Sequence, residues 1–313
     1  MAIARPRPDD AGILGMIGLG NMGEPMARRL AGAGHRLVVH DLDPAPVQRL
    51  VALGARAASS PAEVGRLADT VAVCLPRPAA VEAVALGPGG LAEADRFSAY
   101  IDLSTTGPAV MGRVAHALAQ AGVSCLDSPI SGGVAGARDG TLAIMAAGPP
   151  ALFARLRPVL ETLGRSIFHV GERPGQAQVM KLINNLLSVT AWTVTAEGLA
   201  LGTRAGLDPG LMLDVLQAGS GRNIATEDRF RRYVLTRGFD SGFTVDGICK
   251  DIGLCLAEAQ ARGVPTPIGR AVEQLWLDAS GRGWGGQGHA RIACLYEQWA
   301  GVEFAARPAG EQG

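Results

Sequence analysis

The chain has 313 residues, of which 29 are basic and 29 acidic, so its formal net charge at pH 7 is zero. This balance argues against nucleic acid or an anionic membrane as a partner and favours a small molecule. The length favours two domains, and no segment reaches the roughly 18 consecutive apolar residues of a transmembrane helix.

The cysteines, histidines and chain ends narrow the class of protein further. The five cysteines include no C-x-x-C pair, which predicts reduced thiols in a cytoplasmic protein. The five histidines include no H-x-x-x-H pair, so the sequence predicts no metal site. Residues 1–12 carry prolines and aspartates before any apolar stretch, and we expect a disordered tail there rather than a signal peptide. A second tail is expected at 304–313.

From residue 13 to about residue 170, short apolar runs alternate with amphipathic stretches, which is typical of an α/β fold. The expected strands are 13–17, 36–40, 70–75, 99–103, 124–127, 142–146 and 166–170. The expected helices are 22–33, 45–53, 61–68, 108–121 and 150–163, and several of them begin with proline. We therefore expect a doubly wound, mostly parallel sheet with helices on both faces, in a domain of residues 13–174.

Strand signals stop after residue 174. Residues 176–205 contain no proline and predict one long, mostly buried helix, which begins a second, all-α domain of residues 175–303. Further helices are expected at 209–218, 224–233, 243–263, 267–281 and 289–301.

The first expected strand runs directly into a G-x-G-x-x-G motif and then a helix, as in the Rossmann dinucleotide-binding fold. The motif consists of Gly18, Leu19, Gly20, Asn21, Met22 and Gly23. Its three glycines would permit the tight turn, the approach of the pyrophosphate and close packing of helix on strand, while the helix N-terminus supplies N–H donors. The sequence therefore predicts a nicotinamide dinucleotide site here.

Asp41 ends the second strand, where an acid accepts hydrogen bonds from the adenosine ribose and repels a 2'-phosphate. NAD is therefore favoured, although Arg49, one helix further on, leaves NADP open. Leu75 and Pro76, at the end of the expected strand 70–75, and Thr105, after the expected strand 99–103, are expected beside the nicotinamide. Ordinary strand-to-helix turns are the alternative for both segments.

Only two of the basic residues are lysines, Lys181 and Lys250. A desolvated lysine can titrate near neutral pH whereas arginine stays protonated, so each lysine is a candidate for proton transfer, chance retention being the alternative. Asn185 follows Lys181 by four residues and shares its face of the long helix. An amine and an amide placed in this way could hold an alcohol oxygen.

Four segments resemble the β-hydroxyacid dehydrogenase family, of the 3-hydroxyisobutyrate dehydrogenase and tartronate semialdehyde reductase type. They are residues 16–26, residues 127–133 with 140–142, Gly175 with residues 181–185, and residues 250–254. The resemblance extends in order over almost the whole chain. It implies hydride exchange between a nicotinamide and the alcohol carbon of a small carboxylic acid, with a 6-phosphogluconate dehydrogenase-like helical domain.

The resemblance also implies roles for single residues. Lys181, its pKa lowered by burial, would be the general base in oxidation and the general acid in reduction, and Asn185 would orient it and the substrate oxygen. The alternative is a lysine that extends to solvent beside a helix-packing asparagine. By similarity, Lys250 would contact the nicotinamide or the carboxylate, or would instead form an interdomain ion pair. Arg222 would be a second contact of the carboxylate, or a contact of another substituent of the substrate.

Ser131, Gly132 and Gly133 are expected to open a helix after an apolar strand, so that their N–H groups and the hydroxyl form a pocket for the substrate carboxylate. An ordinary turn is the alternative. The chain departs from the family at residues 285–290, where many members have acids in a glycine-rich turn, which leaves the identity of the acid open.

We therefore expect a cytoplasmic, NAD-dependent or NADP-dependent dehydrogenase of a small 3-hydroxy acid, or a reductase of its semialdehyde. A phosphorylated sugar acid fits less well, because Asn184 stands where the related 6-phosphogluconate dehydrogenases have histidine. A cofactor-binding module without turnover, and a reductase of another small carbonyl or imine, are the alternatives. Apolar residues on more than one face of the long helix predict a homodimer or homotetramer.

Overall fold

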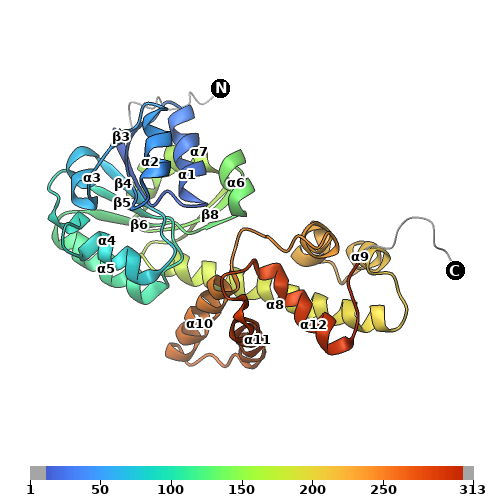
Figure 1. The fold of residues 1–313 in the computed structure, drawn as a ribbon. Helices are drawn as coiled ribbons and strands as arrows, with labels where there is room; N and C mark the ends of the chain where they lie inside the picture. The colour runs from blue at the N-terminus through green and yellow to red at the C-terminus, as the bar shows by residue number, and fades with distance from the viewer. Residues whose placement is uncertain (1–11, 306–313) are drawn as a thin grey trace, which may run out of the picture. The chain divides into compact units, whose positions relative to one another are not determined.

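The computed structural model describes residues 12–305 (Figure 1). These residues form two compact units that divide after Lys181, inside the long helix α8 (Gln176–Arg204). The tails predicted at 1–12 and 304–313 lie almost wholly outside the described residues, and the predicted domain limits, 13–174 and 175–303, stay predictions. None of the described helices is both long enough and apolar enough to cross a membrane.

The first unit is built on one sheet, which has nine strands within the described residues. They are β1 (Ile13–Ile17), β2 (Arg36–His40), β3 (Arg56–Ala57), β4 (Thr70–Val73), β5 (Ala99–Asp102), β6 (Ser124–Asp127), β7 (Ile130–Ser131), β8 (Leu142–Ala147) and β9 (Gly164–Gly171). The strands β3-β2-β1-β4-β5-β6 are parallel in this order, whereas β8 is antiparallel to β6 and β7 and parallel to β9. The direction of winding reverses between β1 and β4, and open α/β sheets bind ligands at such a point.

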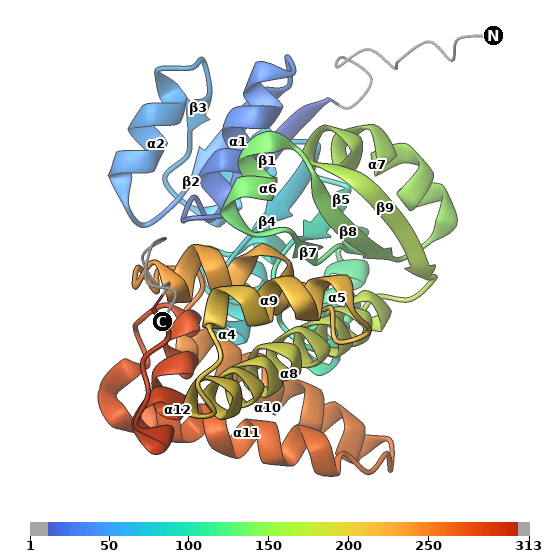
Figure 2. The same ribbon diagram turned by 90° about the vertical axis from the view of Figure 1, so that its right-hand side faces the viewer.

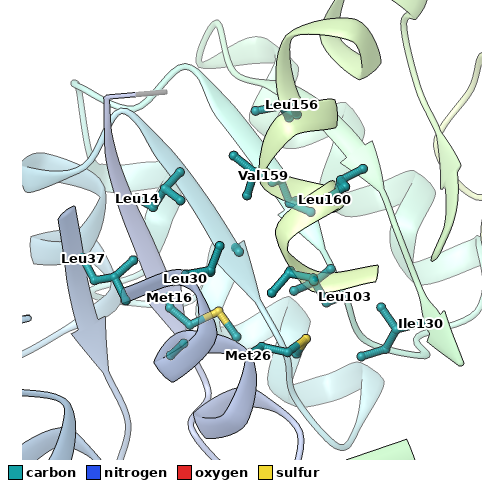
Figure 3. Packing of buried hydrophobic residues seen from close by; sticks show 14 of the residues in the cluster. Leu14, Met16, Met26, Leu30, Leu37, Leu103, Ile130, Leu156, Val159 and Leu160 are labelled. Carbon is teal, nitrogen blue, oxygen red and sulfur yellow. The ribbon is translucent and has the colours of Figure 1, made fainter. Parts of the chain in front are cut away.

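Helices cover both faces of this sheet. They are α1 (Gly23–Gly32), α2 (Pro44–Val51), α3 (Pro61–Leu67), α4 (Pro78–Leu86), α5 (Pro108–Gln120), α6 (Gly133–Asp139) and α7 (Pro150–Leu163), with a 3-10 turn at Leu91–Glu93. Side chains of α1, α6 and α7 pack in one core cluster, whose members Met16, Met26 and Leu160 are drawn in Figure 3. Helices α3, α4 and α5 pack in a second cluster with alternate strand residues, because successive strand residues face opposite sides of the sheet. Figure 2 shows α1, α6 and α7 together on one side.

The second unit is helical throughout its described part. After α8 come α9 (Pro209–Ala218), a π-helical segment (Ala225–Leu235), α10 (Val245–Ala261), α11 (Pro267–Ala279), a π-helical turn (Ser280–Trp284), a 3-10 turn (His289–Arg291) and α12 (Ile292–Ala300). Trp192 of α8 and Trp276 of α11 are fully buried in its core, and the Trp276 indole N–H donates to the Thr193 hydroxyl at 3.0 Å. The strong apolar pattern of α8 is therefore explained in part by packing within this unit.

The structure confirms the expected fold class and differs from the expected elements in a few places. Strand β4 ends at Val73 instead of residue 75, because the Leu75 N–H donates to the Ser104 hydroxyl rather than to a neighbouring strand. Helix α4 was not predicted, since its apolar residues do not follow a clear helical period. The strands β3 and β7 were also missed, at two residues each. The α-helix expected at 224–233 is the π-helical segment.

Candidate functional site

The glycine motif after β1 contains two glycines that the fold itself requires. Gly18 has φ +88°, and a Cβ on it would lie 2.3 Å from the Cys74 carbonyl oxygen. A Cβ on Gly23 would lie 1.8 Å from the Gly18 carbonyl oxygen. By contrast, Gly20 is exposed, and a Cβ there would meet no protein atom within 4 Å. The backbone therefore leaves an open cradle at Gly20, which fits the approach of a dinucleotide pyrophosphate.

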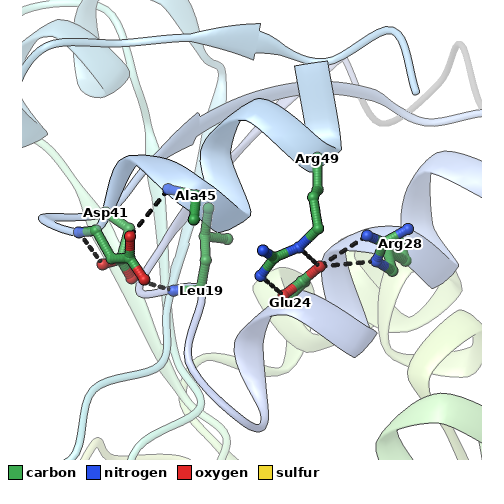
Figure 4. Close-up of polar contacts among 7 residues, drawn as sticks. Leu19, Glu24, Arg28, Asp41, Ala45 and Arg49 are labelled. Atoms are coloured by element: carbon green, nitrogen blue, oxygen red, sulfur yellow. Dashed lines mark hydrogen bonds and ion pairs between the residues drawn. The ribbon is translucent and has the colours of Figure 1, made fainter. Parts of the chain in front are cut away.

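Asp41, at the end of β2, is attached to this loop. Its Oδ2 accepts the Leu19 N–H at 2.5 Å and its Oδ1 accepts the Asp43 N–H at 2.8 Å (Figure 4). Asp43 in turn caps α2 by accepting the Ala45 N–H. The carboxylate is half-buried at the position where a ribose-binding acid is expected. Leu19 is buried, while Asn21 is exposed and Met22 is half-buried.

The carboxyl ends of β4 and β5 meet beside the loop. The Ser104 hydroxyl accepts the Leu75 N–H at 2.9 Å, and the Ser104 N–H donates to Asp102 Oδ1 at 2.8 Å. Leu75 and Thr105 are half-buried and Pro76 is exposed. Hydrogen bonds between the two strand ends therefore fix the turns in which the sequence places nicotinamide contacts.

A buried polar network, which sequence reasoning missed, joins β6 to the start of α8. Gln178 is fully buried, and its Oε1 accepts the N–H groups of Thr106 (2.8 Å) and Gly107 (3.1 Å), just before α5 begins. Its Nε2 donates to the Ser104 carbonyl (3.1 Å) and to Asp127 Oδ1 (2.6 Å). The first turn of α8 is thereby attached to the carboxyl edge of the sheet.

Asp127, the last residue of β6, is the acidic partner in this network. Its Oδ2 accepts the N–H groups of Gly175 (2.9 Å) and Gln178 (3.0 Å), which are among the unsatisfied donors where α8 begins. Burial raises the pKa of Asp127 to about 7, against the lowering effect of the Gln178 hydrogen bond, and Asp102 on the adjacent strand adds to the rise. One signal was available in the sequence, since Gln178 lies one helical turn before Lys181.

Lys181 lies on α8 one turn after Gln178 and is buried, with 8% of its surface exposed. It is the last residue of the first unit. Asn185 lies one turn further along the same helix, in the second unit, so the expected i, i+4 spacing on one helix is present.

In the second unit, the buried carboxylate of Asp251 joins two predicted site residues. Asn185 Nδ2 donates to Asp251 Oδ2 at 2.6 Å, and Lys250 Nζ lies 2.9 Å from Asp251 Oδ1. Asn184 Nδ2 donates to Asn185 Oδ1 at 3.1 Å, which fixes the orientation of the Asn185 amide. The sequence contained the Lys-Asp pair but no sign that Asp251 is the common partner.

The residues expected to bind the carboxylate lie in two places. Ser131 ends the short strand β7 and is half-buried, and the exposed Gly132 and Gly133 have φ of +134° and +65° at the start of α6. Arg222 is exposed on the loop after α9, in the second unit.

One residue of the segment 285–290, where the chain departs from the family, packs in the core of this unit. His289 is buried against Trp192 and Trp276, and its Nδ1 lies 2.6 Å from the Ser241 hydroxyl. Burial lowers the pKa of His289 to about 4. This histidine therefore belongs to the packed interior of the helical unit.

Comparison with known proteins identifies relatives of both units of the chain. Residues 13–171 match the family model described as the NAD binding domain of 6-phosphogluconate dehydrogenase, and residues 175–296 match the NAD-binding domain of NADP-dependent 3-hydroxyisobutyrate dehydrogenase. The chain is 43% identical to a 3-hydroxyisobutyrate dehydrogenase of Pseudomonas aeruginosa over 84% of this chain and 90% of the relative. It is 35% identical to a 2-(hydroxymethyl)glutarate dehydrogenase of Eubacterium barkeri over 92% and 96% of the two chains.

Solved structures give the same result. The crystal structure of a 3-hydroxyisobutyrate dehydrogenase from Salmonella typhimurium is similar with a TM-score of 0.81 and 30% identity, over 90% of this chain and 99% of that one. Fold, cofactor loop and matched sequence thus agree over nearly the whole chain. The chain belongs to the β-hydroxyacid dehydrogenase family, whose members are NAD(P)-dependent oxidoreductases that act on 3-hydroxy acids.

Proposed function

We propose that this enzyme oxidises a small 3-hydroxy acid with NAD, or reduces the matching semialdehyde, and that Lys181 is its general acid and base. The observation that carries the proposal is the position of Lys181. It is buried on a helix whose preceding turn is hydrogen-bonded, through Gln178, to the carboxyl edge of the nucleotide-binding sheet. Ligands of open α/β sheets bind at this edge.

Each proposed catalytic role follows from a side chain. When bound, NAD supplies the acceptor for the hydride that leaves the alcohol carbon. Lys181 takes the hydroxyl proton in oxidation and returns it to the developing alkoxide in reduction. Asn185, whose amide is held by Asp251, orients the substrate oxygen. In this scheme Lys181 transfers the proton and Asn185 orients the oxygen, and neither role requires a metal ion.

The substrate carboxylate needs hydrogen-bond donors and positive charge. We assign it to Ser131, Gly132 and Gly133, with Lys250 and Arg222 as further contacts. The Lys250 ammonium is paired with Asp251, which limits its freedom to move. Because the two relatives differ in the substrate that their names give, 3-hydroxyisobutyrate and 2-(hydroxymethyl)glutarate, the proposal extends to short 3-hydroxy acids as a class.

Preference for NAD over NADP is proposed from Asp41. Its carboxylate stands at the end of β2 and is held there by two backbone N–H groups, so it would face a 2'-phosphate with a fixed negative charge. Leu75, Pro76, Thr105 and Lys250 stay predicted contacts of the nicotinamide half.

The test is a spectrophotometric screen of short 3-hydroxy acids, 3-hydroxyisobutyrate, L-serine and glycerate among them, with NAD and with NADP. Turnover of at least one acid, with the higher kcat/KM for NAD, supports the proposal. Calorimetric binding of NAD without turnover of any acid or semialdehyde in the panel would instead support the cofactor-binding module. If the enzyme turns over only other small carbonyl or imine compounds, it is a reductase of those compounds and not a 3-hydroxy acid dehydrogenase.

A cytoplasmic homodimer or homotetramer is also part of the proposal. Leu187, Val194 and Leu201 of α8 are 66%, 57% and 74% exposed, so this helix keeps an apolar face in addition to its packed one. Covering such a face by a second copy would remove it from water. Sedimentation analysis at several concentrations tests this part independently of activity.

A further inference from the structure

The helix that follows the glycine motif carries an acidic residue with an unusual set of partners. Glu24, in the first turn of α1, accepts hydrogen bonds from two arginines (Figure 4). Its Oε1 binds Arg49 Nε at 2.8 Å and Arg28 Nε at 2.9 Å, and its Oε2 binds Arg49 Nη2 at 2.6 Å. The contact with Arg49 of α2 is bidentate and connects two helices, which is the strongest geometry that an arginine offers a carboxylate.

This ion pair lies in the cavity beside the glycine motif. The cavity has a volume of about 680 Å³, and its lining includes Leu19, Gly20, Glu24, Asp43 and Arg49. The Arg49 guanidinium therefore faces the same space as the loop that is expected to bind the pyrophosphate, on the helix that follows Asp41. An arginine in this neighbourhood is what NADP-binding sites use to hold the 2'-phosphate.

We propose that Glu24 is a specificity-determining residue, which holds Arg49 in a bidentate pair and thereby withholds it from the 2'-phosphate of NADP. The proposal rests on the NAD preference proposed above and adds a second component to it. Asp41 repels the phosphate, while Glu24 occupies the cation that would otherwise attract it. The low pKa of Glu24, about 2 chiefly because of its hydrogen bond with Arg49, keeps the carboxylate charged at any physiological pH.

The size of the expected change in cofactor preference depends on the Arg49 charge that the pair with Glu24 keeps from the phosphate. The Arg49 side chain is half exposed and solvent screens its charge, so a released guanidinium would gain a phosphate contact of modest strength. Glu24→Gln removes the charge and places an amide NH₂ against a guanidinium that has no acceptor to offer. We expect this change to raise the ratio of NADP affinity to NAD affinity about tenfold. The ratio cancels any general effect on the pyrophosphate, because both cofactors carry one.

The experiment is isothermal titration calorimetry of the substrate-free protein with NAD and, separately, with NADP. The wild type is compared with Glu24→Gln, Arg49→Gln and the variant that carries both changes. Glu82→Gln is the matched control, because Glu82 forms a similar bidentate pair with Arg113 between α4 and α5, at 2.8 and 3.2 Å. It should leave both affinities unchanged.

The proposal predicts that the gain in Glu24→Gln disappears in the double variant, and that Arg49→Gln alone changes the ratio little. An unchanged ratio in Glu24→Gln, or a gain that persists without Arg49, would overturn it. Tighter binding of NADP than NAD by the wild type would also overturn it. Failure of the hydroxy-acid screen leaves these binding results interpretable, since they require no turnover.

Discussion

Replacing Gln178 with methionine tests whether the buried network holds the start of α8, the helix that carries Lys181, against the sheet. Methionine has nearly the same shape, but it leaves the N–H groups of Thr106 and Gly107 without an acceptor, and the Ser104 carbonyl and Asp127 Oδ1 without this donor. One buried neutral group that loses its partner costs about 1 to 3 kcal/mol, and such penalties are not additive among neighbours. We expect a loss of about 3 to 5 kcal/mol in the free energy of unfolding.

Urea denaturation followed by circular dichroism measures this loss. Gln176→Met is the matched control: the residue is on the same turn, it is exposed, and it accepts one hydrogen bond, from the Arg173 N–H. It should cost about 1 kcal/mol or less. A Gln178→Met variant as stable as the control would refute the role given to the network.

Gln178→Glu adds a pH dependence to the same test. Glutamate keeps the acceptor for Thr106 and Gly107 but places a second carboxyl beside Asp127, whose pKa of about 7 already reflects burial. Two buried carboxyls at hydrogen-bond distance favour sharing one proton, so the folded variant binds more protons than the unfolded chain and loses stability as pH rises above the ordinary carboxyl pKa of about 4. The variant should therefore be closest to wild type at low pH, and a pH-independent loss would contradict this account.

Three further predictions concern single residues. Gly23→Ala should prevent folding or cost several kcal/mol of stability, because its Cβ would collide with the Gly18 carbonyl. Gly20→Ala should keep the wild-type thermal midpoint but bind NAD more weakly in calorimetry. Equal thermal midpoints for the two variants would contradict these roles. Asp41→Ala should weaken NAD binding and reduce the difference between the affinities for NAD and NADP. Unchanged affinities would show that Asp41 does not contact the cofactor. The pKa of His289 is about 4 in the folded protein, below its ordinary value near 6.5, so between these pH values the unfolded state binds the extra proton. Stability should therefore fall by up to about 3 kcal/mol as pH drops from about 6.5 to 4. His289→Gln should flatten this part of the stability profile, and an unchanged slope would be evidence against the shift.

The sequence predicted the features that depend on local pattern. The strand, glycine motif and helix around Gly20 were predictable because backbone conformation and apolar periodicity are local properties. The same holds for α8, whose thirty-residue run without proline indicated a single helix over residues 176–205, one residue past its observed end at Arg204.

Features that depend on contacts between distant residues could not be predicted in this way. Asp127 and Gln178 are 51 residues apart, and nothing local to either residue indicates that they share a hydrogen bond. The pairing of Glu24 with Arg49 is of the same kind, since arginines are frequent in this chain and only the fold selects one of them. Helix α4 was missed for a different reason, because it is apolar on most sides and lacks the period that reveals a surface helix.

The most direct test of the central claim is the turnover of Lys181→Arg, measured with an accepted hydroxy acid beside calorimetric NAD binding. Arginine keeps the positive charge but does not release its proton near neutral pH. We expect kcat to fall by a factor of about 100 or more, the scale of general acid–base catalysis, while NAD affinity changes little. A variant that retains near-normal kcat would contradict the assignment of proton transfer to Lys181.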